Sequence, residues 1–280
     1  MTSSVDPYAG PFWTVLLMLS VLSVVLACGG HILFRRIVPY KALVAHNDVA
    51  GFTIAVIGVI YAVLLAFVVI VVWQQYNDSD TRYGDEVAAI SDVYAYTREL
   101  PPREGADMRL KIRRYVGLMI DDEWPLMLHG GFSLRASKVI GSVQNELADR
   151  RPTDLRGALV QSQMLKSIRE ARDNRQHRLA DNANSLPMVM WVALIAGAAV
   201  TVGFGYLFGV ENFKAQLAMT GSVAVLIAFS FTILIELDFP FQRDSAIGPG
   251  RWQYLQRSFD LPGAGPDPIP GARPSASAAP

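Results

Sequence analysis

Cysteine is nearly absent from this chain, which has one cysteine and four histidines among 280 residues. A single cysteine cannot build a disulfide framework or a zinc site with several cysteine ligands, so both are excluded. A surplus of either charge is also missing, because 25 lysines and arginines balance 25 aspartates and glutamates. Nucleic-acid-binding proteins carry a basic surplus that neutralises phosphates, and we therefore expect no nucleic-acid partner.

Catalytic motifs are missing as well. The sequence has no phosphate-binding glycine loop, no paired metal-binding histidines and no nucleophile elbow, and its histidines are isolated. Asp121, Asp122 and Glu123, near His129, offer carboxylate oxygens, but consecutive helical residues point in different directions and make a poor cage for a cation. We therefore predict that the protein is not an enzyme and has no metal site and no cofactor.

Four apolar runs of more than twenty residues are the most informative feature that is present. A hydrocarbon layer about 30 Å thick needs about 20 helical residues, so each run is long enough to cross it. Glu236 is the only acidic or basic residue inside them. One such run could be a buried core helix, but four of them predict an all-α integral membrane protein with four transmembrane helices. The runs are Phe12–Phe34, Val49–Val72, Pro187–Gly209 and Ala215–Leu237.

The first run raises two alternatives. A cleaved signal peptide would need a basic residue before it, and residues 1–11 contain none. Val25-Leu26-Ala27-Cys28 loosely resembles a lipoprotein cleavage site, but the bulky Leu26 disfavours it. We expect the run to remain as a membrane helix.

The runs are arranged in two pairs around a long insert. We expect a first transmembrane hairpin at 1–72, a soluble helical insert at 73–186, a second hairpin at 187–241 and a C-terminal segment at 242–280. The insert holds 17 basic and 17 acidic residues and spaces its apolar residues as helices do. Its expected buried stripes are Val87, Ile90, Tyr94 and Thr97; Met108, Ile112, Tyr115 and Met119, ending near Trp124-Pro125; Val139, Ile140, Val143 and Leu147; and Leu155, Leu159, Ser162, Leu165 and Ile168. Proline, glycine, alanine and serine dominate from about residue 261, which predicts disorder there.

The positive-inside rule addresses which side of the membrane the insert faces. The first short loop carries Arg35, Arg36 and Lys41, and Lys214 lies on the same side. Eight arginines lie near the span ends on the same side as the insert, and they outnumber the four basic residues on the side of the first loop. The count favours a cytoplasmic insert and C-terminus for a multi-pass protein of the cell inner (plasma) membrane.

Two runs carry small residues on one helical face, where they allow close packing of helix backbones in lipid. These helix-packing candidates are Gly51, Ala55, Gly58, Ala62 and Ala66 in the second run, and Ala193, Gly197, Thr201, Gly205 and Gly209 in the third. Another face of the second run is a bulky apolar stripe, which either contacts lipid or forms a hydrophobic constriction that gates by dewetting. The stripe consists of Val56, Ile60, Val63 and Phe67, continued by Ile70.

Polar residues mark two span ends. Glu236 and Asp238 end the fourth run, where such groups either cap the helix at the interface or line a water-filled path. Asn47 and Asp48 precede the second run, and we expect one of them to cap that helix.

Several phrases, in order from about Asn47 to Phe241, resemble the bestrophin-like membrane protein family of bacteria, whose function is largely unestablished. The family-motif residues among them are Glu86, Tyr115, Glu123, Trp124, Pro240 and Phe241. The phrases are Gly58-Val-Ile-Tyr-Ala-Val-Leu-Leu-Ala-Phe67 with Trp73, Glu86-Val-Ala-Ala-Ile90, Tyr115 followed by Asp122-Glu123-Trp124, Leu186-Pro187 with Trp191, Gly203-Phe-Gly-Tyr-Leu-Phe-Gly209 and Asp238-Phe-Pro-Phe241.

The resemblance implies kinship with bestrophins, which are pentameric anion channels with a cytosolic insert and a second span that lines the pore with bulky apolar residues. It makes Val56, Ile60, Val63 and Phe67 candidates for a pore neck. The dense acidic calcium clasp of bestrophin channels is missing, because only Glu236, Asp238 and Asp244 lie at the end of the fourth span or directly after it. The resemblance therefore does not imply calcium gating here.

Two hypotheses follow. The first is a homo-oligomeric anion channel in the lipid bilayer, with inorganic anions as the permeant partner. The second is a non-conducting membrane scaffold or sensor whose helical insert binds a protein partner.

Overall fold

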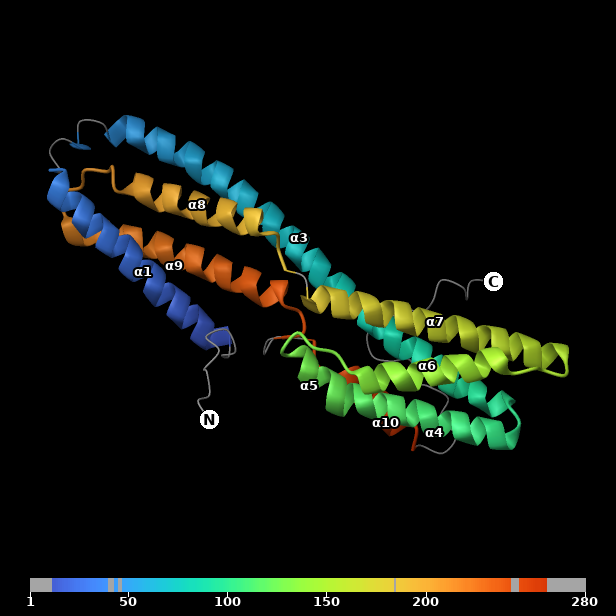
Figure 1. The fold of residues 1–280 in the computed structure, drawn as a ribbon. Coiled ribbons are helices and arrows are strands. Elements are labelled where there is room, and N and C mark those ends of the chain that lie inside the picture. The colour runs from blue at the N-terminus through green and yellow to red at the C-terminus, as the bar shows by residue number, and fades with distance from the viewer. Residues whose placement is uncertain (1–11, 40–42, 45–46, 184, 243–246, 261–280) are drawn as a thin grey trace, which may run out of the picture. The chain divides into compact units, whose positions relative to one another are not determined.

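The computed structural model describes residues 12–39, 43–44, 47–183, 185–242 and 247–260 (Figure 1). These ranges contain helices and turns but no β-strand, which confirms the all-α prediction. The disorder predicted from about residue 261 concerns positions outside the described residues. The chain divides into two compact units. Unit 1 takes the described residues within Met1–Tyr76 and Ser185–Phe239, and unit 2 takes those within Asn77–Asn184, Pro240–Gln242 and Ala246–Pro280.

Unit 1 contains α1 (Phe12–Ile37), the first part of α3 (Asn47–Tyr96), α8 (Met188–Gly205) and α9 (Phe213–Asp238). Each of these helices is long and apolar enough to cross a membrane. Helix α1 runs beside α9, and α3 runs beside α8 (Figure 1). The expected four apolar helices are therefore present, and they pack as pairs that join segments distant in the sequence.

The contact of α3 with α8 and α9 forms the core of unit 1. Val68 and Val72 of α3 meet Leu194 of α8 and Leu234 of α9, and all four are buried. Asp238 Oδ1 accepts a hydrogen bond of 2.8 Å from the backbone N–H of Leu186, just before α8. The carboxylate of Asp238, at the end of α9, thus fixes the start of α8. Of the two roles expected for this residue, a cap or the lining of a water-filled path, this contact fits the cap.

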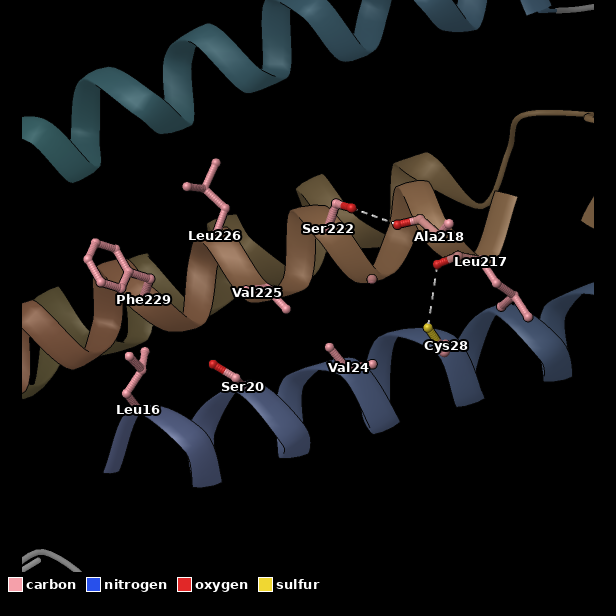
Figure 2. A pocket seen from close by; sticks show the side chains of 11 residues that line it. Leu16, Ser20, Val24, Cys28, Leu217, Ala218, Ser222, Val225, Leu226 and Phe229 are labelled. Atoms are coloured by element: carbon pink, nitrogen blue, oxygen red, sulfur yellow. Dashed lines mark hydrogen bonds between the residues drawn. The ribbon is translucent and has the colours of Figure 1, made fainter. Parts of the chain in front are cut away.

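A shallow apolar groove of about 820 Å³ separates α1 from α9 (Figure 2). Leu16 and Val24 of α1 face Val225 and Phe229 of α9, and none of the described side chains that line the groove is acidic or basic. Exposed apolar surface of this kind is what a lipid-facing helix pair presents.

A polar cluster is buried between α1 and α9 near the other end of the pair. The ring of His31, predicted to be isolated, is fully buried 4.8 Å from the ring of Tyr206, with its Nδ1 3.4 Å from Thr220 Oγ1. Arg35 donates to Gln216 Oε1 at 2.7 Å. Asn47, one of the two residues expected to cap α3, exchanges hydrogen bonds of 3.0 and 2.9 Å with the backbone of Gly209. Sequence spacing cannot reveal such a partner on a distant segment.

Unit 2 is a helical bundle. The end of α3 leads through a short 3₁₀ turn (Thr97–Glu99) into α4, and α4 packs against α6, which packs against α7. The remaining elements are α4 (Pro102–Leu118), a π-helical turn (Met119–Glu123), α5 (Trp124–Met127), α6 (Leu134–Asp149), α7 (Leu155–Ala183) and α10 (Gly250–Ser258).

Two details of unit 2 differ from the sequence predictions. The helix expected to stop near Trp124-Pro125 continues, because Pro125 lies in the first turn of α5, where its missing N–H costs nothing. The stripe predicted for α7 is wrong at Leu155, Leu159 and Ser162, which are exposed. The buried face of α7 is instead Met164, Ser167, Ile168, Ala171, Arg175, Arg178 and Asn182. Its second half is polar, so an apolar pattern could not reveal it.

Candidate functional site

The apolar stripe predicted as a pore neck lies on the unit 1 part of α3. Val56, Ile60, Val63 and Phe67 are between 44% and 65% exposed in the single chain. A large apolar side chain in this state is covered in the functional protein by lipid, by another chain or by a narrow pore. The stripe therefore needs a partner that the single chain does not supply.

The small residues of α3 occupy another face of the same helix. Ala55, Ala62 and Ala66 are exposed, and Gly51 and Gly58 are half-buried. The face that packs within the chain carries Tyr61, Val68 and Val72. At 100° per residue, the centres of the three faces lie roughly 100–130° apart around the helix. Two faces of α3, one bulky and one small, thus remain open toward neighbours.

The small residues of α8 lie in mixed surroundings. Ala193 is exposed, Gly197, Thr201 and Gly205 are half-buried, and Gly209 is buried in the connection that follows the helix. At Gly197 the backbone approaches α3 so closely that an added Cβ would lie 2.5 Å from Cδ2 of Tyr61. Glycine is required there by space, since any side chain would collide with the ring.

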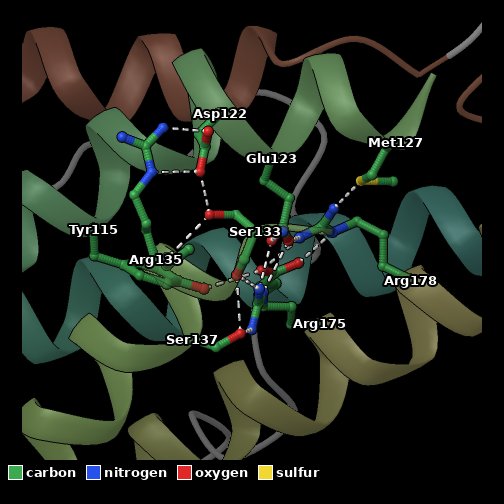
Figure 3. A network of polar contacts seen from close by, with 11 residues as sticks. Tyr115, Asp122, Glu123, Met127, Ser133, Arg135, Ser137, Arg175 and Arg178 are labelled. Carbon is green, nitrogen blue, oxygen red and sulfur yellow. Dashed lines mark hydrogen bonds and ion pairs between the residues drawn. The ribbon is translucent and has the colours of Figure 1, made fainter. Parts of the chain in front are cut away.

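The family-motif residues gather in unit 2 around a buried network of charges. Glu86 comes from α3 and Glu123 from the π-helical turn, and both side chains are fully buried. The guanidinium of Arg178 on α7 pairs with both carboxylates, and Figure 3 shows its contact with Glu123. Its Nε donates to Glu86 at 2.7 Å, and its Nη2 donates to Glu86 at 3.1 Å and to Glu123 at 2.8 Å. One fully buried cation thus serves two buried carboxylates.

Arg175, one turn earlier on α7, completes the network. Its Nε donates to Glu123 Oε1 at 2.8 Å, and its other nitrogens reach Ser137 Oγ at 2.9 Å and the Ser133 carbonyl at 3.0 Å. Two arginines and two glutamates make the network neutral as a whole. This balance of charge limits the cost of burying these groups, since an unpaired buried charge is very costly.

The electrostatic effect is clearest at Glu123 and Arg178. Burial would raise the pKa of the Glu123 carboxyl, but the hydrogen bond from Arg175 and the charges of both arginines outweigh it, and the pKa is lowered. Burial likewise opposes the charged form of Arg178, and the two carboxylates overcome it and raise its pKa above the usual range. Both groups are therefore held in their charged forms.

The π-helical turn sets the direction of Glu123. One extra residue in the turn rotates the helix face relative to α4, and such bulges are frequent at functional positions. Glu123 also accepts a hydrogen bond of 3.1 Å from the backbone N–H of Ser133, whose hydroxyl caps α6 by accepting from Ala136 N–H at 3.1 Å. The neighbouring Asp122 is bound by Ser133 Oγ and Arg135. The network thus links α3, α6 and α7 through one turn.

Aromatic rings and the segment after α9 enclose the network. The guanidinium carbon of Arg178 lies over the ring of Trp124, 5.1 Å from the ring centre. The centres of the Trp124 and Phe241 rings are 6.0 Å apart, and the rings meet edge-on. Tyr115 Oη is 3.5 Å from Glu86 and its ring is 5.9 Å from the fully buried Trp252 of α10. The backbone carbonyl of Pro240 accepts from Ile247 N–H at 2.8 Å.

Sequence reasoning missed the two arginines and α10. Arg175 and Arg178 counted only toward the charge of the insert and its orientation, although their spacing of three residues places them on one helical face with Ile168 and Ala171. That spacing was the available signal. For α10 the signal was Trp252 with Leu255, two large apolar residues in a polar segment.

The carboxylates of this region are engaged by arginine. Among the described residues, no group of three or more histidine, cysteine, aspartate or glutamate side chains could hold a metal ion. Asp122 and Glu123 bind Arg135, Arg175 and Arg178. The network is therefore suited to bracing helices.

Comparison with known proteins relates this architecture to a family. A comparison with curated proteins finds no match. Two bacterial bestrophin homologue structures from Klebsiella pneumoniae, each with one substitution, share the fold. The first is 15% identical over 86% of this chain and 96% of its own, with a TM-score of 0.59. The second is 14% identical over 86% and 98%, with a TM-score of 0.60.

A third structure, described as a membrane protein with one substitution, is 12% identical over 84% of this chain and 96% of its own, with a TM-score of 0.59. The model of the Bestrophin-like domain matches residues 9–251, which include all four apolar helices and all the motif residues. The chain therefore belongs to the Bestrophin-like family.

Proposed function

We propose that this protein is a homo-oligomeric channel for inorganic anions in the cell inner membrane. Two spans, within 1–72, precede a cytoplasmic helical insert at 73–186, and two spans, within 187–241, follow it. The stripe of Val56, Ile60, Val63 and Phe67 from several copies forms the neck of a shared pore. The family resemblance supports the transported class, because bestrophins conduct anions.

The observation that carries this proposal is the arrangement of faces around α3. One face packs on α8 inside the chain, while the bulky stripe and the small-residue face are left open. In a ring of copies, a helix needs one face for its own chain, one for the neighbouring chain and one for the central pore. Small residues suit the neighbouring chain, because they let backbones approach closely. The bulky stripe then faces the pore.

A neck built in this way has no groups that bind ions, and it acts by admitting or excluding water. A narrow ring of valine, isoleucine and phenylalanine side chains excludes water until it widens, and dewetting closes the path to ions. Shortening a neck side chain should therefore make the path easier to wet and increase conduction.

Chloride efflux from vesicles tests the neck assignment. The purified protein is reconstituted as wild type, as Ile60→Ala and as the control Ile195→Ala, whose side chain is equally apolar and exposed but lies on α8 and not on the proposed neck stripe. We expect Ile60→Ala to raise the efflux rate several-fold and Ile195→Ala to leave it unchanged. Equal rates for all three proteins would contradict the neck assignment.

The scaffold or sensor hypothesis gives a different set of results. It predicts no efflux above that of empty vesicles from well-folded protein, and a detergent-solubilised mass of one or two chains. A shared central pore needs a ring, so those two results together would replace the channel proposal.

A further inference from the structure

Among the described residues of unit 1, His31 is the most deeply buried titratable side chain. It lies on α1 with no exposed surface, although histidine changes its charge close to neutral pH. The centre of its ring is 4.8 Å from that of Tyr206, which it meets edge-on, and 6.0 Å from that of Phe213. The proposed pore makes no use of this residue, so its burial calls for another explanation.

The two ring nitrogens of His31 differ in their surroundings. Nδ1 lies 3.4 Å from the hydroxyl oxygen of Thr220 on α9, whereas Nε2 is buried and has no hydrogen-bond partner among the described residues. A neutral ring carries one N–H and needs only one acceptor, but an imidazolium carries an N–H on both nitrogens and needs two. The packed site therefore suits the neutral ring.

The charges around His31 also oppose a proton on its ring. Arg35 lies one turn later on α1, so a charged ring would place a second cation beside it. Asp48 and Glu211, the described acidic residues at this end of unit 1, are both exposed, and neither pairs with the ring. The other titratable or charged side chains around the cluster are Cys28 of α1, Tyr206 after α8 and the exposed Lys214 of α9. A protonated His31 would thus be an unpaired buried cation, which is costly.

The same cluster fixes the connection between α8 and α9. Arg35 donates to a backbone carbonyl of the connection at 2.9 Å, and Tyr206 Oη donates to the Ala27 carbonyl of α1 at 2.7 Å. Helix α1 approaches Tyr206 so closely that a Cβ at Gly30 would lie 2.8 Å from its hydroxyl oxygen. His31 lies between these contacts along α1, so the packing of its ring and the position of the connection are coupled.

We propose that His31 is an acid-sensitive latch, which releases α1 from α9 and from the α8–α9 connection when its ring takes up a proton from water. The neutral ring fits the packed cluster, whereas the imidazolium needs a second acceptor and a counter-charge that the cluster lacks. Acid therefore favours the released arrangement, in which water can reach the charged ring. Histidine in water gains its proton near pH 6.5, so we expect release only below about that pH. The latch concerns one helix pair of unit 1 and does not depend on conduction.

The native Cys28, the only cysteine of the chain, reports on this contact. It lies about one turn before His31 on α1, and its thiol faces the Leu217 carbonyl of α9 at 3.8 Å (Figure 2). The purified protein is placed in lipid nanodiscs, in which both membrane faces meet the buffer, and reacted with 4,4′-dithiodipyridine at pH 7.5 and at pH 5.0. The rate of the same chain in sodium dodecyl sulfate at each pH is the reference. The ratio of the two rates gives the protection of Cys28 without the intrinsic pH dependence of the thiol.

In the wild type we expect the protection of Cys28 to fall about threefold or more between pH 7.5 and pH 5.0. His31→Gln cannot take up a proton and should keep its protection. His177→Gln removes an exposed histidine of α7 and should respond as the wild type does. Unchanged protection in the wild type, or an equal fall in His31→Gln, would overturn the inference.

A second position on α1 keeps the test independent of how His31→Gln folds. Ser20→Cys in a Cys28→Ser chain lines the same groove about two turns earlier, and it retains His31. A latch at the His31 end should change the protection at position 20 less than that at position 28. Equal falls at the two positions would mean that acid loosens the whole helix pair, and would overturn the latch.

Discussion

At the scale of single residues, Arg178 has the most demanding environment in unit 2. Its guanidinium is fully buried, pairs with Glu86 and Glu123, and lies over the ring of Trp124. Such a network contributes specificity only while every member keeps its partners, since one missing charge leaves another buried and uncompensated. The forked geometry of arginine is also needed, because lysine cannot donate to both carboxylates in this way.

Replacing Arg178 by methionine should therefore strongly destabilise the protein. We expect a loss of about 3–5 kcal/mol in the free energy of unfolding, because Glu86 then loses its arginine partner and stays buried, while Glu123 keeps only Arg175. Thermal unfolding in detergent measures the loss, and the exposed Arg169→Met on the same helix is the control. Equal melting temperatures for the two variants would show that the network is dispensable.

The lowered pKa of Glu123 predicts a pH dependence of stability. A carboxyl with a depressed pKa in the folded state stabilises that state above its unfolded pKa, about 4.3, and this contribution disappears as the pH falls through the folded pKa. The stability gap between wild type and Glu123→Gln should therefore be full near pH 7 and shrink below about pH 4. A gap that widens on acidification would contradict the assignment.

Gly197 provides a steric test in unit 1. A Cβ at this position would lie 2.5 Å from the ring of Tyr61, whereas a Cβ at Gly203 of the same helix would meet nothing within 4 Å. Gly197→Ala should therefore cost about 1–3 kcal/mol through overpacking, and Gly203→Ala should be tolerated. The ranking of the two melting temperatures checks the contact between α3 and α8, and the reverse ranking would refute it.

At the scale of elements, the buried face of a helix could be predicted from the sequence where apolar side chains form it, but not where polar side chains do. The four apolar helices and the stripe of Ile140, Val143 and Leu147 on α6 were predictable, because burial there is recorded in the spacing of apolar residues. The second half of α7 was not predictable in this way, because arginines occupy its buried face. The packing of α10 on Tyr83 and Tyr115 depends on contacts more than a hundred residues apart.

The small-residue face and the neck stripe of α3 stay predictions, because they concern surfaces that the single chain leaves open. The sequence shows that these surfaces consist of small or apolar residues, but it does not show which molecules cover them.

The docking of α10 is tested by truncation. A chain that ends at residue 260 keeps Trp252 and the ion pair of Arg113 with Asp260, whereas one that ends at 246 loses both. We expect the first to melt as the full chain does and the second to lose stability by about 3–5 kcal/mol, as for removal of a buried tryptophan. Identical melting of both truncated chains would mean that α10 does not stabilise unit 2.

At the scale of the whole molecule, the family, the four apolar helices and the open faces of α3 all bear on the proposal that several copies assemble around one pore. The α3 helix leaves two of its three faces uncovered in the single chain. In the proposed function, a ring of copies covers one of these faces with a neighbouring chain and turns the other toward the pore. The zero net charge of the sequence is then compatible with anion transport, because selectivity depends on the groups that line the path rather than on the total charge.

The mass of the solubilised protein tests this assembly. Native mass spectrometry in detergent should give an integer multiple of the 30.7 kDa chain of at least three. Substituting the small face of α3 with bulky residues, as in Ala62→Leu, should shift the population toward smaller species, while Ala199→Leu on α8 should not. A wild-type monomer would remove the shared pore.

Current recorded across a planar bilayer under a chloride gradient tests the central claim most directly. With purified, folded protein, the account predicts single-channel steps whose reversal potential lies close to the chloride equilibrium potential. A reversal potential near the cation equilibrium potential, or a silent bilayer containing folded oligomer, would contradict it.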